Sequence, residues 1–174
     1  MKMLLRGLFA TAMLVASIAL MGGSASASIT PDPYSFGASD GGAFTSRTIL
    51  GTSTCRVSGL TGTLRGTTTG AEGSVTAATI SGCSGAIVNG RILPPIVIRI
   101  INGTVLIAVN VLIRNILGGE CLYSGLLTGT IIRGASSITA TNPALPLLIE
   151  LVRTCTRTAD VTLTINTGAR ISWL

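Results

Sequence analysis

The sequence predicts an all-β fold, an antiparallel sandwich or squat barrel of about eight to ten strands that is held by two disulfides. Residues 161–166 alternate apolar and polar side chains, as a half-buried strand does. Two β-branched runs, 96–101 and 104–109, are separated by Asn-Gly, the strongest short-range hairpin signal. No stretch carries a sustained 3.6-residue apolar stripe with capping residues at both ends, so helices are not expected.

The chain begins with the pattern of a secretory signal peptide. Lys2 and Arg6 precede an apolar run over 8–21, and small residues follow up to Ala27. The run is shorter than the ~20 residues that a membrane-spanning helix needs, so cleavage between Ala27 and Ser28 is favoured over an anchor. We therefore expect a signal peptide over 1–27 and a single β-rich secreted domain over 28–174, without a membrane span once the signal is removed.

The segments between these signals are also interpreted mainly as strands. Residues 29–34 contain two prolines and cannot be helical, and 75–80 show a weaker alternation. Only 144–153 leaves a short helix open as an alternative to a strand, because its apolar residues fit either period. The frequent Thr, Val and Ile residues suit a pleated sheet.

The Asn102-Gly103 turn fixes a register. A two-residue type I′ loop needs positive φ at both positions and would pair Ile100 with Val105 and Ile98 with Ile107. One face of the hairpin is then wholly aliphatic and is expected in the core, whereas the face with Arg99 is at least partly wet. A membrane helix over 92–117 is disfavoured, because Arg99 near its centre would cost about 2.5–3.5 kcal/mol.

The four cysteines predict two disulfides. Cys55, Cys83, Cys121 and Cys155 are too far apart for metal-binding pairs, and an even set in an exported chain is typical of disulfides. Residues 55–66 recur, with two single-residue insertions, as 121–134 in the order C-x-x-S-G-L, T-G-T, R-G. If the repeat is real rather than chance in a Gly/Thr-rich chain, it selects Cys55–Cys83 and Cys121–Cys155 from the three pairings that four cysteines allow.

Composition excludes several kinds of site. The chain has no His, 3% aromatic and 10% charged residues. Catalytic units that use His, zinc sites that use His, and aromatic platforms for nucleic acid or sugars are thereby excluded. After signal removal the chain has ten Arg residues and six carboxylates. The Arg residues are scattered and do not form the basic cluster that is typical of a nucleic-acid-binding surface. We expect no cofactor, no metal and no nucleic acid.

The carboxylates are the one source of catalytic chemistry. A hydrolase of the glycosidase type needs two of them facing one groove. No two are brought together by the sequence, although Glu120 and Glu150 could become neighbours through a disulfide. Asp40-Gly41-Gly42 and Asn102-Gly103-Thr104 are interpreted as turns rather than as a calcium loop or a glycosylation site. The mature carboxylates are Asp32, Asp40, Glu72, Glu120, Glu150 and Asp160.

Several short motifs resemble a group of small secreted actinobacterial proteins of unknown function and, more distantly, the secreted "activator of alkane oxidation" type. They are Ile29-Thr30-Pro31, Cys55 leading into Gly62-Thr63-Leu64, residues 78–83 ending in Cys83, and 121–125 beginning with Cys121. The resemblance implies a β-rich secreted domain and supplies no catalytic residue.

These observations favour a non-catalytic secreted or cell-envelope protein. Strands that are apolar on both sides, such as 96–111, exceed what one small core hides and predict self-association or contact with hydrophobic material. A carboxylate-based extracellular hydrolase is the first alternative. A small membrane-embedded β-barrel is the second, although five aromatic residues are few for the girdles of such a barrel.

Overall fold

The computed structural model describes residues 28–37, 41–48, 51–150 and 155–172. All the regular secondary structure in these ranges is β-strand. The all-β class is therefore confirmed, whereas the predicted signal peptide over 1–27, including Ala27, lies outside the described residues. The strands are β1 (Ser28–Thr30), β2 (Tyr34–Phe36), β3 (Gly41–Thr48), β4 (Gly51–Gly66), β5 (Gly70–Ser81), β6 (Ile87–Ile101), β7 (Thr104–Asn115), β8 (Glu120–Thr130), β9 (Ser137–Glu150), β10 (Thr158–Asn166) and β11 (Arg170–Ser172).

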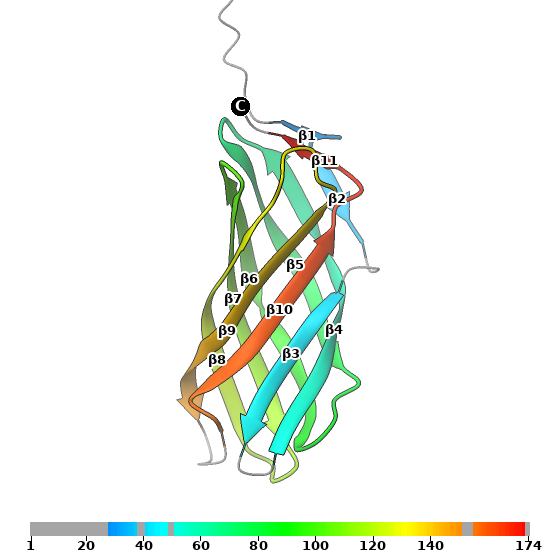
Figure 1. Ribbon diagram of the computed structural model, residues 1–174. Coiled ribbons are helices and arrows are strands. Elements are labelled where there is room, and N and C mark those ends of the chain that lie inside the picture. Colours follow the sequence, from blue (N-terminus) through cyan, green and yellow to red (C-terminus); the bar gives the residue numbers. More distant parts are fainter. Residues whose placement is uncertain (1–27, 38–40, 49–50, 151–154, 173–174) are drawn as a thin grey trace, which may run out of the picture.

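Strands β3 to β10 close into one antiparallel barrel (Figure 1). Their order is β4-β3-β10-β9-β8-β7-β6-β5, and a further pairing of β4 with β5 joins the two edges. Following the register around the wall from Arg56 on β4 leads back to Arg65 on the same strand, nine positions further along (65 − 56). This stagger accounts for the strand tilt in Figure 1, and it identifies a barrel rather than a sandwich.

Inward side chains fill the barrel. Alternate residues of the long strands expose 1% of their surface or less, among them Phe44, Val57, Leu64, Val75, Ile96, Ile98, Ile107, Tyr123, Leu127, Ile138, Val161 and Leu163. A cavity that held water would leave accessible area on the side chains around it. The described interior is therefore a packed aliphatic core rather than a ligand chamber.

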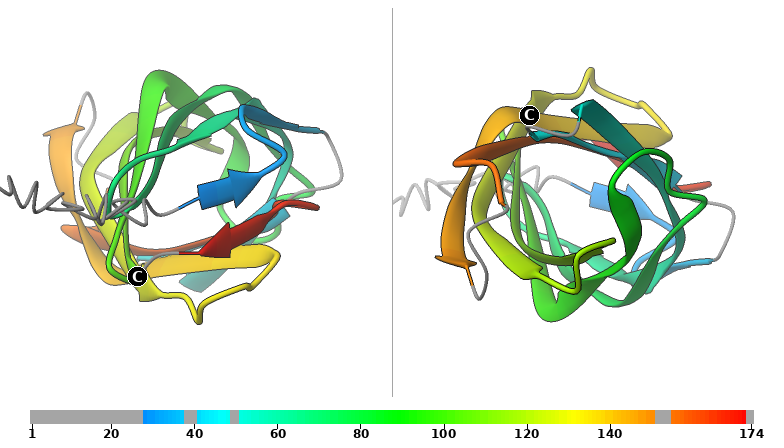
Figure 2. Two further views of the ribbon diagram at one scale, coloured as in Figure 1. Left: turned by 90° about the horizontal axis from the view of Figure 1, so that it is seen from above. Right: turned by 90° about the horizontal axis from the view of Figure 1, so that it is seen from below.

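A short sheet covers one end of the barrel, the capped end (Figure 2). β1 pairs with β11, and the facing residues Ile29 and Ile171 are 2% and 0% exposed. The backbone of Ile171 also bonds to Gly134 and Ala135 in the β8–β9 connection. The two strands therefore shield the last layer of core side chains from water.

Both disulfides lie at the opposite end, the disulfide end, and have the predicted pairing. Cys55 on β4 is bonded to Cys83 after β5, and Cys121 on β8 is bonded to Cys155 after β9. β4 and β8 hold the second place in two consecutive four-stranded meanders, β3–β6 and β7–β10, so the repeated sequences occupy equivalent positions. The topology therefore supports the internal repeat.

The glycines of the repeated Thr-Gly-Thr are required by close approach between strands. A Cβ added at Gly62 would lie 2.9 Å from the Cα of Val75 on β5. A Cβ added at Gly129 would lie 3.2 Å from the Cα of Ala140 on β9. The repeat thus preserves the same packing constraint in both halves.

The predicted hairpin is confirmed. Asn102 and Gly103 have φ of 49° and 82°, and Ile100 pairs with Val105 and Ile98 with Ile107. Those four side chains are at most 1% exposed, so the aliphatic face belongs to the core. The segment that left a helix open is strand up to Glu150, because β9 pairs with β8 and β10 on either side.

We expect Gly103→Val to lower the free energy of unfolding by about 1–3 kcal/mol, because a β-branched residue is strained at positive φ. Chemical denaturation of the disulfide-intact domain measures the loss. Thr104→Val, which places the same side chain on the adjacent extended residue, is the control and should stay within about 0.5 kcal/mol of the parent. Equal stability of the two variants would contradict the turn assignment.

Reduction should destabilise the domain strongly. The disulfides join residues 28 and 34 positions apart, and in the chain-entropy treatment each contributes about 3–4 kcal/mol. Calorimetry with and without reductant should show a much lower Tm after reduction. Non-reducing peptide mapping should recover only the two pairs described, and a Cys55–Cys155 peptide would refute the pairing.

Candidate interaction surface

The structure does not join the described carboxylates into a catalytic pair. Glu150 lies opposite Cys121 in the β8–β9 register, and Glu120 is the residue next to Cys121. Because successive side chains of a strand point to opposite faces, Glu120 and Glu150 face different sides of the sheet. Asp32 accepts a hydrogen bond from the backbone N–H of Gly66, and Asp40 lies outside the described residues.

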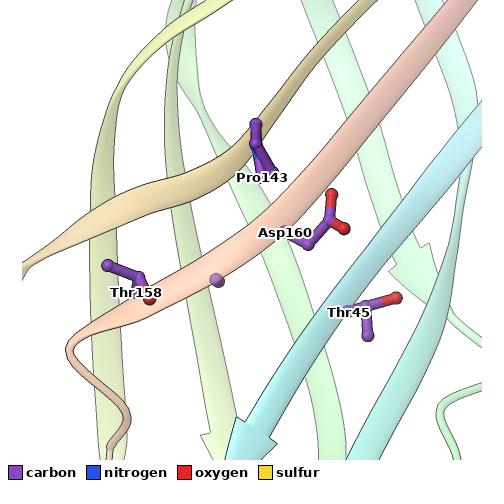
Figure 3. A pocket seen from close by; sticks show the side chains of 5 residues that line it. Thr45, Pro143, Thr158 and Asp160 are labelled. Carbon is purple, nitrogen blue, oxygen red and sulfur yellow. The ribbon is translucent and has the colours of Figure 1, made fainter.

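Glu72, Glu120 and Asp160 line depressions on the surface, and none of these depressions contains a second described carboxylate. A depression of about 360 Å³ lies on the outer wall across β3, β9 and β10 (Figure 3). Asp160 is its one described carboxylate, beside the hydroxyls of Thr45 and Thr158 and the ring of Pro143. A single carboxylate among hydroxyl groups lacks the second acid–base group that carboxylate-based hydrolysis needs.

Metal and membrane-helix signals are likewise missing from the described part of the chain. No three His, Cys, Asp or Glu side chains there are grouped so that they could hold a metal ion. None of the described residues forms a helix with the length and apolarity to cross a membrane.

The outer wall has two unlike halves. Over β10, β3, β4 and β5 the outward residues are mainly Thr, with Ser, Arg and Asp among them. Neighbouring strands place Thr hydroxyls against each other, as between Thr61 and Thr76 at 3.3 Å and between Thr45 and Thr54 at 3.5 Å. This half has the solvated surface that is usual for a β-protein.

The other half, which we call the β6–β9 face, comprises the outward residues of β6 to β9 and of their connections. It carries every large hydrophobic side chain that the described residues leave exposed. They are Val88, Val97, Ile101, Ile116, Leu117, Leu126, Ile132, Leu148 and Ile149. Six such side chains on β6, β8 and β9 and three in the connections of this face form a surface that a monomeric protein rarely leaves to water.

Two cross-strand rows organise the wall of this face. Val97, Ala108 and Leu126 are direct neighbours on β6, β7 and β8, and with Leu106 and Arg99 they line a depression of about 200 Å³. Closer to the disulfide end, Leu112, Leu122 and Ile149 are neighbours on β7, β8 and β9, and Arg91 stands next to Leu112. Both rows therefore combine aliphatic side chains with an adjacent Arg on β6.

Sequence reasoning found part of this face. The apolar outer side of residues 96–111 follows from the hairpin register, and the structure places it next to Leu122 and Leu126. The contributions of β8 and β9 depend on which strands become neighbours in the closed barrel. The register of β9 is interrupted, because Leu122 pairs with Ile149 and Tyr123 with Leu147, which leaves Leu148 as an extra residue. No sequence period reveals such a bulge.

Comparison of the chain with protein-family models, with curated proteins and with solved structures finds no significant match.

Proposed function

We propose that the chain is a non-catalytic secreted or cell-envelope protein that acts by adsorbing to apolar material through the β6–β9 face. One observation carries the proposal. All the large hydrophobic side chains that are exposed in the described residues belong to this half of the barrel. Complete burial of an exposed Val, Leu or Ile side chain stabilises by roughly 1.5–3 kcal/mol. These side chains are 38–80% exposed, so contact with an apolar phase recovers a corresponding part of that energy.

The packed interior supports an external role. A barrel that carried a small molecule would need a chamber, and the inward side chains of the described strands fill that space. The polar half supports contact through the β6–β9 face alone, because the outward Thr, Arg and Asp side chains of the polar half are suited to water.

Two disulfides fit an exported protein, because such bonds persist in oxidising compartments and are rare in the cytosol. The lone carboxylates of the outer depressions give no comparable support to the hydrolase alternative.

The mature domain should adsorb to hexadecane droplets, and Val97→Thr with Leu126→Thr should weaken adsorption about tenfold or more, because two central aliphatic side chains are replaced. Thr suits a strand, so the fold should persist, as circular dichroism will check. Depletion of protein from the aqueous phase measures adsorption.

Two control variants test the surface. Thr54→Ser with Thr63→Ser changes the polar half, and Val97→Ile with Leu126→Met keeps the face apolar; both should adsorb as the parent does. A parent that stays monomeric and in the water phase would overturn the proposal. Hydrolysis of an ester or glycoside that Asp160→Asn or Glu120→Gln abolishes would favour the enzyme instead.

A further inference from the structure

We propose that the disulfide end of the β6–β9 face docks on an anionic lipid bilayer. In this arrangement Ile116 and Leu117 of the β7–β8 turn enter the interface, and Arg91 and Arg114 lie at the level of the headgroups. This inference rests on the proposed function and names the apolar material.

The β7–β8 turn holds its two aliphatic side chains in water by a defined set of hydrogen bonds. The Oδ1 atom of Asn115 accepts from the N–H groups of Leu117 at 3.0 Å and Gly119 at 2.9 Å. The N–H of Ile116 donates to the carbonyl of Ala86 at 2.9 Å. Ile116 and Leu117 are nevertheless 59% and 61% exposed. Their exposure is therefore built into an ordered turn.

Further aliphatic side chains surround this turn. Val88 is the second residue of β6 and lies next to the turn, since Ile87 pairs with Asn115. Leu148 and Ile149 lie near the end of β9, at the same end of the barrel. These three are between 51% and 61% exposed. Five of the nine exposed hydrophobic side chains thus gather at the disulfide end.

The charges beside the turn complement an anionic surface. A depression of about 230 Å³ lies on the outer wall, and Arg91, Arg114 and Glu120 are among the residues that line it. It adjoins the turn, because Arg114 and Glu120 flank the turn in the chain. Two guanidinium groups against one carboxylate leave a positive balance, and Arg suits phosphate because of its planar donor geometry. Aliphatic side chains flanked by cationic ones are the combination that holds peripheral proteins at anionic lipid.

A similar amino-acid sequence occurs in the first of the two meanders. Residues 47–51 are Arg-Thr-Ile-Leu-Gly, and residues 114–118 are Arg-Asn-Ile-Leu-Gly. Thr48 and Gly51 pair across β3 and β4, the hairpin equivalent to β7–β8, and Gly51 and Gly118 both have positive φ. Residues 49–50 lie outside the described residues. The sequences of two equivalent hairpins thus share Ile-Leu-Gly shortly after an Arg.

Shape favours a lipid layer over a second copy of this chain. The exposed aliphatic side chains belong mainly to a turn and to the outer side of the barrel wall. Seen along its axis, this wall is round (Figure 2). Two rigid convex walls touch over a narrow strip, whereas a stable protein interface needs complementary surfaces of about 800 Å² on each side. A deformable lipid layer can surround a convex turn.

Flotation with vesicles tests the docking. The disulfide-intact domain should bind phosphatidylcholine vesicles with 30% phosphatidylglycerol, and it should bind pure phosphatidylcholine at least about tenfold more weakly. Ile116→Ser with Leu117→Ser should reduce binding about tenfold or more. Arg91→Gln and Arg114→Gln should each reduce it by roughly fivefold, and added salt should reduce it as well.

Ile132 gives a matched control, because it is 80% exposed in the connection at the capped end. Ile132→Ser removes a comparable aliphatic group and should leave vesicle binding unchanged. Leu117→Trp should show a blue-shifted emission on anionic vesicles relative to the parent, which contains Trp173, whereas Ile132→Trp should not. Equal effects at both ends would overturn the proposed orientation.

The outcomes separate this inference from the proposed function. Equal binding to both vesicle types, or hexadecane adsorption without vesicle binding, would overturn the lipid inference and leave the adsorption proposal standing. Failure to bind either material would overturn both. A dimer in light scattering that Ile116→Ser with Leu117→Ser dissociates would assign the turn to a second copy instead.

Discussion

Closure of the barrel is the constraint on which the rest of the structure depends. Once the first and last strands of the ring, β3 and β10, pair with each other, every inward position faces the same narrow interior, and the described strands fill it with aliphatic side chains. Closure also leaves the eight-stranded wall without a free edge that could bind a further strand. The surfaces that remain for function are the outer wall and the two ends.

Closure of the barrel does not determine which side chains the outer wall carries. Tilt and stagger constrain inward side chains, whereas an outward position accepts Thr as readily as Leu. On β4 and β10 many such positions are Thr, whereas on β6 to β8 Val, Leu and Ala stand among Arg, Asn, Ser and Thr residues. Stability of the barrel does not account for this difference, and the proposed contact with apolar material rests on it.

The parts that the sequence could predict depend on local geometry. The register of β6 and β7 follows from the φ values that Asn102 and Gly103 adopt, and the pairing of Cys55 with Cys83 follows from the repeat. Closure depends on the pairing of distant strands, and either a sandwich or a barrel satisfies the same alternation. Exposure of Ile116 and Leu117 was not predictable, because their residue types match the buried strand before them. The turn that exposes them depends on the side-chain and backbone hydrogen bonds of Asn115 and on the bond from Ile116 to the distant Ala86.

The connections at the two ends of the barrel are held by different kinds of bonds. At the capped end β11 bonds to Gly134 and Ala135, and β1 lies over the core, so those backbone groups are engaged within the fold. At the disulfide end Cys83 and Cys155 fix connections, and the Tyr123 hydroxyl holds Thr156 at 3.0 Å. A turn that carries apolar side chains needs such fixed neighbours, because otherwise it could fold back onto the wall and bury them. One such neighbour is the β5–β6 connection, which the Cys55–Cys83 disulfide attaches to β4 and whose Ala86 carbonyl accepts a hydrogen bond from the N–H of Ile116.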